Sequence, residues 1–180
     1  MQVLDDFLDA GEHAALLAAV ASPAFPWRRT PILFPAPAGL DEAGNVQFVH
    51  GFLQHKPGFD FRSDRLPLVR PLLDRLAARA WIKVKLNRTL PRGQHLVYGW
   101  HVDTRRPGAT TGVYYLNAND GYTAFEDGRR VDSVANRLVL FDARSRHSGA
   151  SCTDAPQRLV LNLNFLPAPG GPGDFSRAAG

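Results

Sequence analysis

Two histidines and one aspartate are the side chains of this sequence best suited to hold a metal ion. His101 and Asp103 are separated by one residue, so on an extended strand both side chains point to the same face. His147 follows 46 residues after His101, behind an apolar run and a short polar turn. Two imidazoles and one carboxylate form the facial triad that holds non-haem ferrous iron and leaves adjacent coordination positions open. The spacing therefore predicts a metal site at these three residues.

Arg158 is the fourth residue with chemical potential, 11 residues after His147. It begins an alternating stretch, 157–165, in which the even-numbered residues from 158 to 164 share one face and the apolar odd-numbered residues share the other. An inward-facing arginine is costly to bury without an anion, and its planar guanidinium matches a carboxylate in bidentate fashion. Alone, Arg158 would favour an internal salt bridge. Beside the metal-ligand pattern, it predicts a carboxylate ligand.

The elements that must position these residues change in character at Trp81. Before it, we expect a helix over 11–21, a proline-rich stretch over 22–58 with a strand at 46–53, and a helix over 66–80. After it, alternating segments separated by glycine, proline, aspartate or asparagine predict strands at 81–90, 95–103, 110–117, 121–125, 129–134, 136–141 and 157–165. This order predicts an antiparallel sandwich or barrel with helices packed on one side.

The strand predicted at 95–103 carries a further expectation about its side chains. Strict alternation places Tyr98 and Trp100 on the face opposite to His101. We therefore expect both aromatic residues to pack away from the metal site.

From Trp81 to Leu166 the sequence resembles the Fe(II)- and 2-oxoglutarate-dependent oxygenases, most closely their prolyl-hydroxylase-like branch. The segments that carry the resemblance are HVD at 101–103, VYYLN at 113–117, GYTAFEDG at 121–128, NRLVLFDARSRHSG at 136–149 and QRLVLNLNF at 157–165. The resemblance implies a mainly β fold with packed helices, a double-stranded β-helix (jelly roll, cupin-like). It implies Fe(II) bound by His101, Asp103 and His147.

The resemblance also implies a 2-oxoglutarate site, with O2 as the second substrate. Arg158 would pair with the distal carboxylate of 2-oxoglutarate, and the phenol of Tyr115 would bond to the same carboxylate. The family's tyrosine about ten residues before the first metal ligand is replaced here by Leu90-Pro91-Arg92. Asn87 or Arg88 could reach into the near side of the cosubstrate pocket instead. Halogenases of this superfamily replace the carboxylate ligand by a small residue, so Asp103 predicts hydroxylation or a related oxidation.

Read with this resemblance, the chain is expected to form one oxygenase domain over 1–166. Residues 1–80 would be a helical and proline-rich lead-in, 81–166 the jelly-roll core, and 167–180 a flexible tail. The expected substrate is an amino acid, a peptidyl residue such as proline, or a small metabolite. Arg105 and Arg106, directly after the first two ligands, are candidate substrate contacts.

Composition narrows the class of protein. The chain of 180 residues has 44% hydrophobic and 21% charged residues, as globular domains do, and one cysteine, which excludes an internal disulfide. No apolar run approaches the ~18 residues of a membrane span, and acids stand where a signal peptide needs cations. We therefore expect a soluble, cytoplasmic protein with no membrane partner.

Two alternatives to a hydroxylase stay open at this stage. A nucleic-acid demethylase of the same superfamily would use the same ligand order, and the net charge of +4 is compatible with it. That branch usually has a second arginine soon after the first, whereas none follows Arg158 before Arg177, so nucleic acid is an improbable partner. The other alternative is a non-catalytic jelly-roll module that binds a metal for structural reasons.

Overall fold

The chain forms two antiparallel β-sheets and a pair of helices. The computed structural model describes residues 1–32 and 44–175. The large sheet contains β1 (Gln2–Leu4), β2 (Arg28–Pro31), β3 (Val46–Lys56), β4 (Phe59–Arg62), β5 (Ala80–Thr89), β6 (Thr110–Tyr115), β9 (Arg137–Asp142) and β11 (Arg158–Leu166). The small sheet contains β7 (Tyr122–Phe125), β8 (Arg130–Asp132) and β10 (His147–Gly149).

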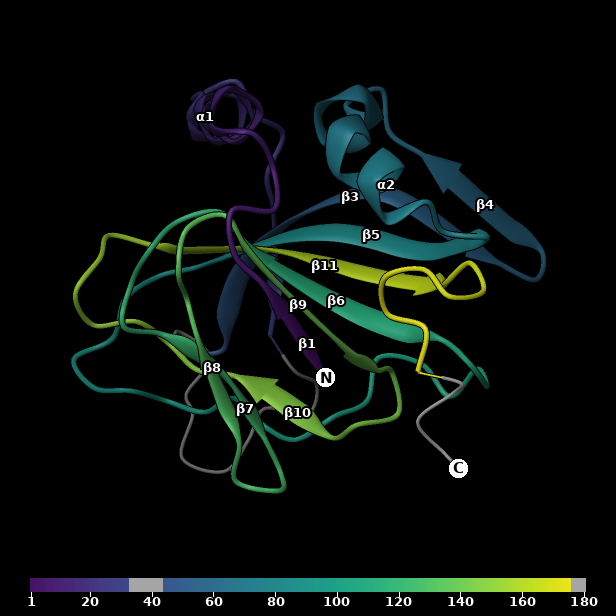
Figure 1. Ribbon diagram of the computed structural model, residues 1–180. Coiled ribbons are helices and arrows are strands. Elements are labelled where there is room, and N and C mark those ends of the chain that lie inside the picture. The colour runs from purple at the N-terminus through teal and green to yellow at the C-terminus, as the bar shows by residue number, and fades with distance from the viewer. Residues whose placement is uncertain (33–43, 176–180) are drawn as a thin grey trace.

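The strand order makes β11 the centre of the large sheet. The order is β1-β9-β6-β11-β5-β3-β2, with β4 paired to β3, and the small sheet runs β10-β7-β8. Both helices lie over one face of the large sheet, and the small sheet lies across the other (Figure 1). This arrangement confirms the predicted antiparallel sandwich with helices packed on one side.

The alternation of β11 explains how the large sheet serves two layers. Its leucines at 159, 161 and 163, together with Phe165, join the core cluster under the helices, whereas Val160 joins a second cluster with residues of the small sheet. Burying such a side chain contributes roughly 1.5–3 kcal/mol. The apolar face therefore fixes the strand's orientation, and Arg158 and Asn164 are turned toward the space between the sheets.

The helices begin close to where the sequence predicts them. Helix α1 spans Ala10–Ala21, and Asp9 and Glu12 form a capping box at its N-terminus. The helix expected over 66–80 is shorter: a 3₁₀ turn, η1 (Leu66–Val69), leads into α2 (Arg70–Leu76). Ala77 ends α2 in a left-handed conformation (φ 45°), with its N–H bonded to the carbonyls of the last turn. The chain then turns, and β5 begins at Ala80, so the expectation of helix over 77–80 was wrong.

Residues 167–175, which the sequence assigns to a flexible tail, lie against the large sheet. The Thr110 hydroxyl donates to the Gly173 carbonyl at 2.6 Å, and the Gly173 N–H donates to the Gln2 side chain at 3.0 Å. These bonds attach the segment at Gly173 to β6 and to β1. The rest of that segment, 176–180, lies outside the described residues. Within the described chain, no helix is both long and apolar enough to cross a membrane.

Candidate metal centre and adjoining cavity

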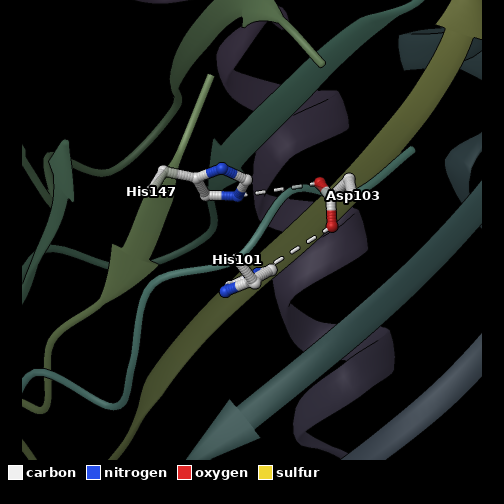
Figure 2. Close-up of side chains that lie close together, drawn as sticks. All are labelled: His101, Asp103 and His147. Atoms are coloured by element: carbon white, nitrogen blue, oxygen red, sulfur yellow. Dashed lines mark ion pairs between the residues drawn. The ribbon is translucent and has the colours of Figure 1, made fainter. Parts of the chain in front are cut away.

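His101, Asp103 and His147 come together at the mouth between the two sheets, as the sequence predicts. Their candidate ligand atoms all lie within 4.8 Å of one another. Asp103 is 4.0 Å from the Nε2 of His101 and 3.7 Å from the Nε2 of His147, and Figure 2 shows the three side chains pointing toward a common centre. These separations are too long for hydrogen bonds and leave room for one ion among the three.

Backbone carbonyls fix the protonation pattern of both imidazoles. His101 Nδ1 is 3.2 Å from the Gly99 carbonyl, and His147 Nδ1 is 3.0 Å from the Ser145 carbonyl. A carbonyl only accepts hydrogen bonds, so each Nδ1 carries the proton and the Nε2 of the neutral ring presents a bare lone pair. Burial lowers the pKa of His147 below its ordinary value, which keeps that ring neutral. Both rings are therefore prepared to be metal ligands.

Asp103 is held as a carboxylate by polar residues of the large sheet. Burial by itself would raise its pKa, but His147, Lys83 and the Asn164 amide outweigh it, and the pKa lies below its ordinary value. Asn164 and Thr111 donate hydrogen bonds to one carboxylate oxygen at 3.1 and 3.2 Å. The alternation over 157–165 predicts the inward direction of Asn164, but only proximity in space reveals the role of both donors.

The segment that carries His101 is not the regular strand predicted over 95–103. Val97 pairs with Ala150 and His101 pairs with His147. Between these two pairs the segment 97–101 therefore has one residue more than the segment 147–150. The extra residue is a bulge, and Gly99 within it has φ 134°, a conformation that favours glycine. The bulge reverses the alternation.

The reversed alternation explains a wrong prediction about the aromatic residues. Tyr98 lines the same cavity as His101, although it was expected on the opposite face. Trp100 was expected to pack, yet 41% of it is exposed. Strict alternation holds only in a strand without an extra residue.

A cavity of about 290 Å³ extends from the three ligands to Arg158. The lining residues, beyond the three ligands and Arg158, are Ile32, Gln47, Lys83, Lys85, Asn87, Thr89, Tyr98, Gly99, Val102, Val113, Thr123, Ser148, Gly149, Val160 and Asn162. The register places Arg158 opposite Thr89, and Asn164, which holds Asp103, opposite Lys83. Arg158 and the metal ligands therefore lie at opposite ends of one cavity.

Arg158 is buried without an acidic partner in the described part of the chain. Its exposure is 5%, and its guanidinium donates only to neutral oxygens: Ser133 at 3.1 Å, the Tyr122 carbonyl at 3.3 Å and Thr123 at 3.4 Å. The salt bridge that would have explained a buried arginine is absent from the described residues. A buried cation with only neutral partners is suited to an anionic ligand.

Tyr115 lies beneath Arg158 rather than on the cavity wall. The Arg158 guanidinium is 5.6 Å from the Tyr115 ring centroid, and the Tyr115 hydroxyl donates to Thr123 at 2.7 Å. Because Thr123 accepts that proton, its own hydroxyl proton is free for another acceptor. Thr123 lines the cavity, and although it lies in the segment GYTAFEDG, this role was not predicted.

Two further polar groups on the cavity wall lack hydrogen-bond partners within the described chain: Asn87 Oδ1 and Thr89 Oγ1. Tyr98 also lines the cavity, and burial raises the pKa of its phenol in spite of a hydrogen bond with Arg92, so the phenol stays protonated. Asn87 was predicted for this side of the pocket. Its alternative, Arg88, faces the other way and stacks on Trp27 and Phe48.

The candidate substrate residues Arg105 and Arg106 lie outside this cavity. Both are exposed. Arg106 borders a separate hollow with Thr104 and the turn between β3 and β4. That hollow adjoins Asp103 along the chain but shares no lining residue with the cavity.

Comparison with known proteins places this geometry in a fold family. No protein-family model and no curated sequence matches the chain. Among solved structures, a 2OG-Fe(II) oxygenase family oxidoreductase from Burkholderia pseudomallei matches with a TM-score of 0.61 and 14% identity, over 91% of this chain and 84% of the other. The fold is that of the 2OG-Fe(II) oxygenases.

Two prolyl hydroxylases support the same assignment. A Trichoplax adhaerens prolyl hydroxylase, solved with a hypoxia-inducible factor peptide, has a TM-score of 0.62 and 14% identity over 92% of this chain and 83% of the other. A Pseudomonas putida prolyl-4-hydroxylase has a TM-score of 0.53 and 19% identity over 93% and 92%. The double-stranded β-helix predicted from the sequence is thereby confirmed.

Within this oxygenase fold, the donor set of the site fits ferrous iron and a dicarboxylate. Two bare imidazole nitrogens and one carboxylate match a 2-His-1-carboxylate centre. At the far end, Arg158 lacks an acidic partner among the described residues, and Thr123 has a proton to donate. Between the two ends, the unpartnered Thr89 hydroxyl can donate to a further ligand oxygen.

Proposed function

We propose that the protein is an Fe(II)- and 2-oxoglutarate-dependent dioxygenase that hydroxylates a C–H bond of an amino acid, a peptidyl residue such as proline, or a small metabolite. In the balanced reaction, 2-oxoglutarate, O2 and the substrate R–H give succinate, CO2 and R–OH. One observation carries this proposal. The cavity has three candidate metal ligands at one end, and at the other a buried arginine without an acidic partner among the described residues.

The residues of the chain would have separate tasks in this reaction. The Nε2 atoms of His101 and His147 and the carboxylate of Asp103 would hold the iron, and Asn164 would keep that carboxylate oriented. Bound iron and 2-oxoglutarate would supply the oxidising chemistry. The protein positions the groups and excludes water.

Arg158 would bind the distal carboxylate of 2-oxoglutarate, with Thr123 donating a second hydrogen bond. Tyr115, the phenol expected to contact that carboxylate, would support it from below by bonding Thr123 and stacking under Arg158. We therefore assign Tyr115 a positioning role. Arg105 and Arg106 stay candidates for contacts with the part of a substrate that extends beyond the cavity.

The direct test is succinate release by iron-loaded protein. Purified protein with Fe(II) and 2-oxoglutarate is offered free amino acids, proline-containing peptides and alkylated nucleotides. We expect one of the first two groups to stimulate succinate formation, and Asp103→Ala to abolish it. Full activity of Asp103→Ala would exclude that residue as a ligand. Bound iron without turnover on any substrate would favour a non-catalytic metal-binding module.

A second test needs no knowledge of the substrate. Titration calorimetry of the Mn(II)-loaded protein measures 2-oxoglutarate binding directly. Arg158→Met is expected to weaken that binding about 100-fold, since a bidentate charged pair contributes roughly 1.5–3 kcal/mol. Unchanged affinity would place the dicarboxylate elsewhere.

The charge distribution does not favour the nucleic-acid alternative. Six arginines of the surface are paired with nearby acids: Arg70–Asp74, Arg129–Asp127, Arg130–Asp132, Arg137–Asp5, Arg144–Asp142 and Arg146–Glu126. Binding to a nucleic-acid backbone requires unneutralised cations grouped on one face. Stimulation of succinate release by alkylated nucleotides alone would contradict this argument.

A further inference from the structure

Two lysines on the cavity wall have no assigned ligand, although the charge of Lys83 helps to lower the pKa of Asp103. Lys83 and Lys85 lie on β5, two residues apart, and both line the cavity. They are two of the three lysines in the chain. The register pairs Lys83 with Asn164 and Lys85 with Asn162 on β11. Both lysines therefore stand on the inward face, toward the end that holds the metal ligands.

Neither lysine forms an ion pair or hydrogen bond with a described residue. Lys85 is mostly buried, and burial, reinforced by the nearby charge of Lys83, lowers its pKa from 10.5 to about 8. Asp103 is the only acidic side chain among the described residues that line the cavity, against three cations: these lysines and Arg158. A bound divalent metal would add to this excess positive charge, and a 2-oxoglutarate dianion would offset only part of it.

The two lysines lie far from Arg158, the residue assigned to the distal carboxylate of 2-oxoglutarate. Along β11, Asn162 and Asn164 are four and six residues from Arg158, or about 13 and 20 Å at the rise of an extended strand. Asn164 holds Asp103, so the lysines lie near the metal ligands. A substrate has to present its reacting C–H bond at this end.

We propose that Lys83 and Lys85 bind an anionic group, a carboxylate or a phosphate, on the primary substrate. This inference rests on the proposed function and narrows its substrate class. Unpaired cations on a cavity wall destabilise the fold unless an anion meets them, and a free acid or a phosphorylated metabolite supplies that anion close to the reacting carbon. A proline or another neutral residue inside a peptide carries no such charge, so the inference favours a free acid or a phosphorylated metabolite over a neutral peptidyl residue.

The test uses the protein loaded with Mn(II) and 2-oxoglutarate, which binds ligands without turnover. Thermal shifts are measured with the free amino acids, their primary amides, inorganic phosphate and glycerol 3-phosphate. Acids or phosphates are expected to raise the melting temperature, and their amide or neutral counterparts are not. The best ligand is then titrated into Lys83→Met, Lys85→Met and Lys56→Met. Lys56 is exposed and outside the cavity, so it controls for removal of a positive charge.

Loss of either cavity lysine is expected to weaken binding of that ligand at least about tenfold, the size of one charge-assisted hydrogen bond. Affinity for 2-oxoglutarate is expected to stay within about twofold of wild type, and Lys56→Met to behave as wild type. Higher affinity for the phosphates than for the carboxylic acids would indicate a phosphorylated substrate. Higher affinity for the acids would indicate a carboxylic acid.

Several outcomes would overturn the inference. They are stabilisation by amides as strong as by acids, no stabilisation by any of these anions, or loss of 2-oxoglutarate affinity in a lysine variant, which would assign the lysines to the cosubstrate. Failure of the wild-type protein to bind Mn(II) or 2-oxoglutarate would instead contradict the proposed function. The two failures are therefore distinguishable.

Discussion

His101 and His147 are oriented for metal binding by the same kind of local hydrogen bond. In each case the backbone carbonyl two residues earlier accepts a hydrogen bond from Nδ1. That contact sets the tautomer and aims Nε2 at Asp103. The carboxylate is likewise oriented before any ion arrives, because Asn164 and Thr111 hold one of its oxygens. Little reorganisation is needed when a metal binds.

Removal of one ligand tests this arrangement. His147→Ala is expected to weaken Fe(II) or Mn(II) binding more than about 100-fold, beyond the 10- to 100-fold typical of outer-shell changes. His95→Ala is the matched control, since His95 pairs with Asp120 away from the cavity. Metal content after dialysis and calorimetric affinity measure both variants. Equal affinities in the two would refute the assigned centre.

The bulge beside β10 shows how a connection without regular strand structure can place a ligand. The extra residue turns both His101 and Tyr98 into the cavity, and the backbone allows it because Gly99 occupies a conformation that L-residues rarely adopt. Position 99 is thus part of the site although it carries no side chain.

Gly99→Ala should therefore disturb the metal centre. We expect the strained backbone to cost about 1–3 kcal/mol of stability and the displaced His101 to weaken metal binding about tenfold. Gly93→Ala, in the same connection with open space around its Cα, should bind metal as wild type does. Denaturant unfolding and Mn(II) titration distinguish the two, and a Gly99→Ala protein with normal metal affinity would contradict the role of the bulge.

Gly121, just before β7, holds the other end of the cavity in shape. A Cβ at this position would lie 2.8 Å from Arg158 Cδ and 2.7 Å from Asn119 Oδ1. Gly121→Ala is therefore expected to shift Arg158, weakening 2-oxoglutarate binding about tenfold while Mn(II) binding is unchanged, since overpacking costs about 1–3 kcal/mol. Gly11→Ala, in helix α1 with no atom within 4 Å, is the control. A parallel loss of metal affinity would indicate general misfolding instead.

The protein as assembled keeps an excess of positive charge inside its cavity. Lys85 is the clearest case, because Lys83 on its own strand and Arg28 add repulsion, and only Asp103 opposes it. In the unliganded protein, this repulsion among buried charges lowers the free energy of unfolding. Lys85→Met, of similar volume, should consequently fold and be more stable at neutral pH, by up to about 3 kcal/mol.

The pH dependence of that gain has a defined sign. Below pH 8 Lys85 is charged in both states, so the full cost of burial is present. Between pH 8 and 10.5 the unfolded chain binds more protons than the folded one, so the wild-type free energy of unfolding rises with pH relative to Lys85→Met. Urea unfolding at pH 7, 9 and 10.5, with Lys56→Met as control, measures it. A difference between wild type and Lys85→Met that does not change with pH would contradict the burial of a charged lysine.

Much of the site could be predicted because its signals are local. The alternation of β11 gave the directions of Arg158 and Asn164, and one residue between His101 and Asp103 suggested a shared ion. The bulge was not predictable, since an extra residue shows only when the pairing partner is known. The end of α2 at Ala77 was missed because its stop is a left-handed alanine and not the glycine that usually marks one.

By itself, the sequence determined which residue types were available and which face of each regular strand is apolar, because those properties depend on neighbours along the chain. Only the tertiary structure decided which groups meet. It set His147 against Asp103, Tyr115 beneath Arg158, and two lysines on a cavity wall where Asp103 is the only acid among the described lining residues, because these contacts join strands paired across the sheets. The positive charge of the cavity arises from that assembly, and no single segment of the chain displays it.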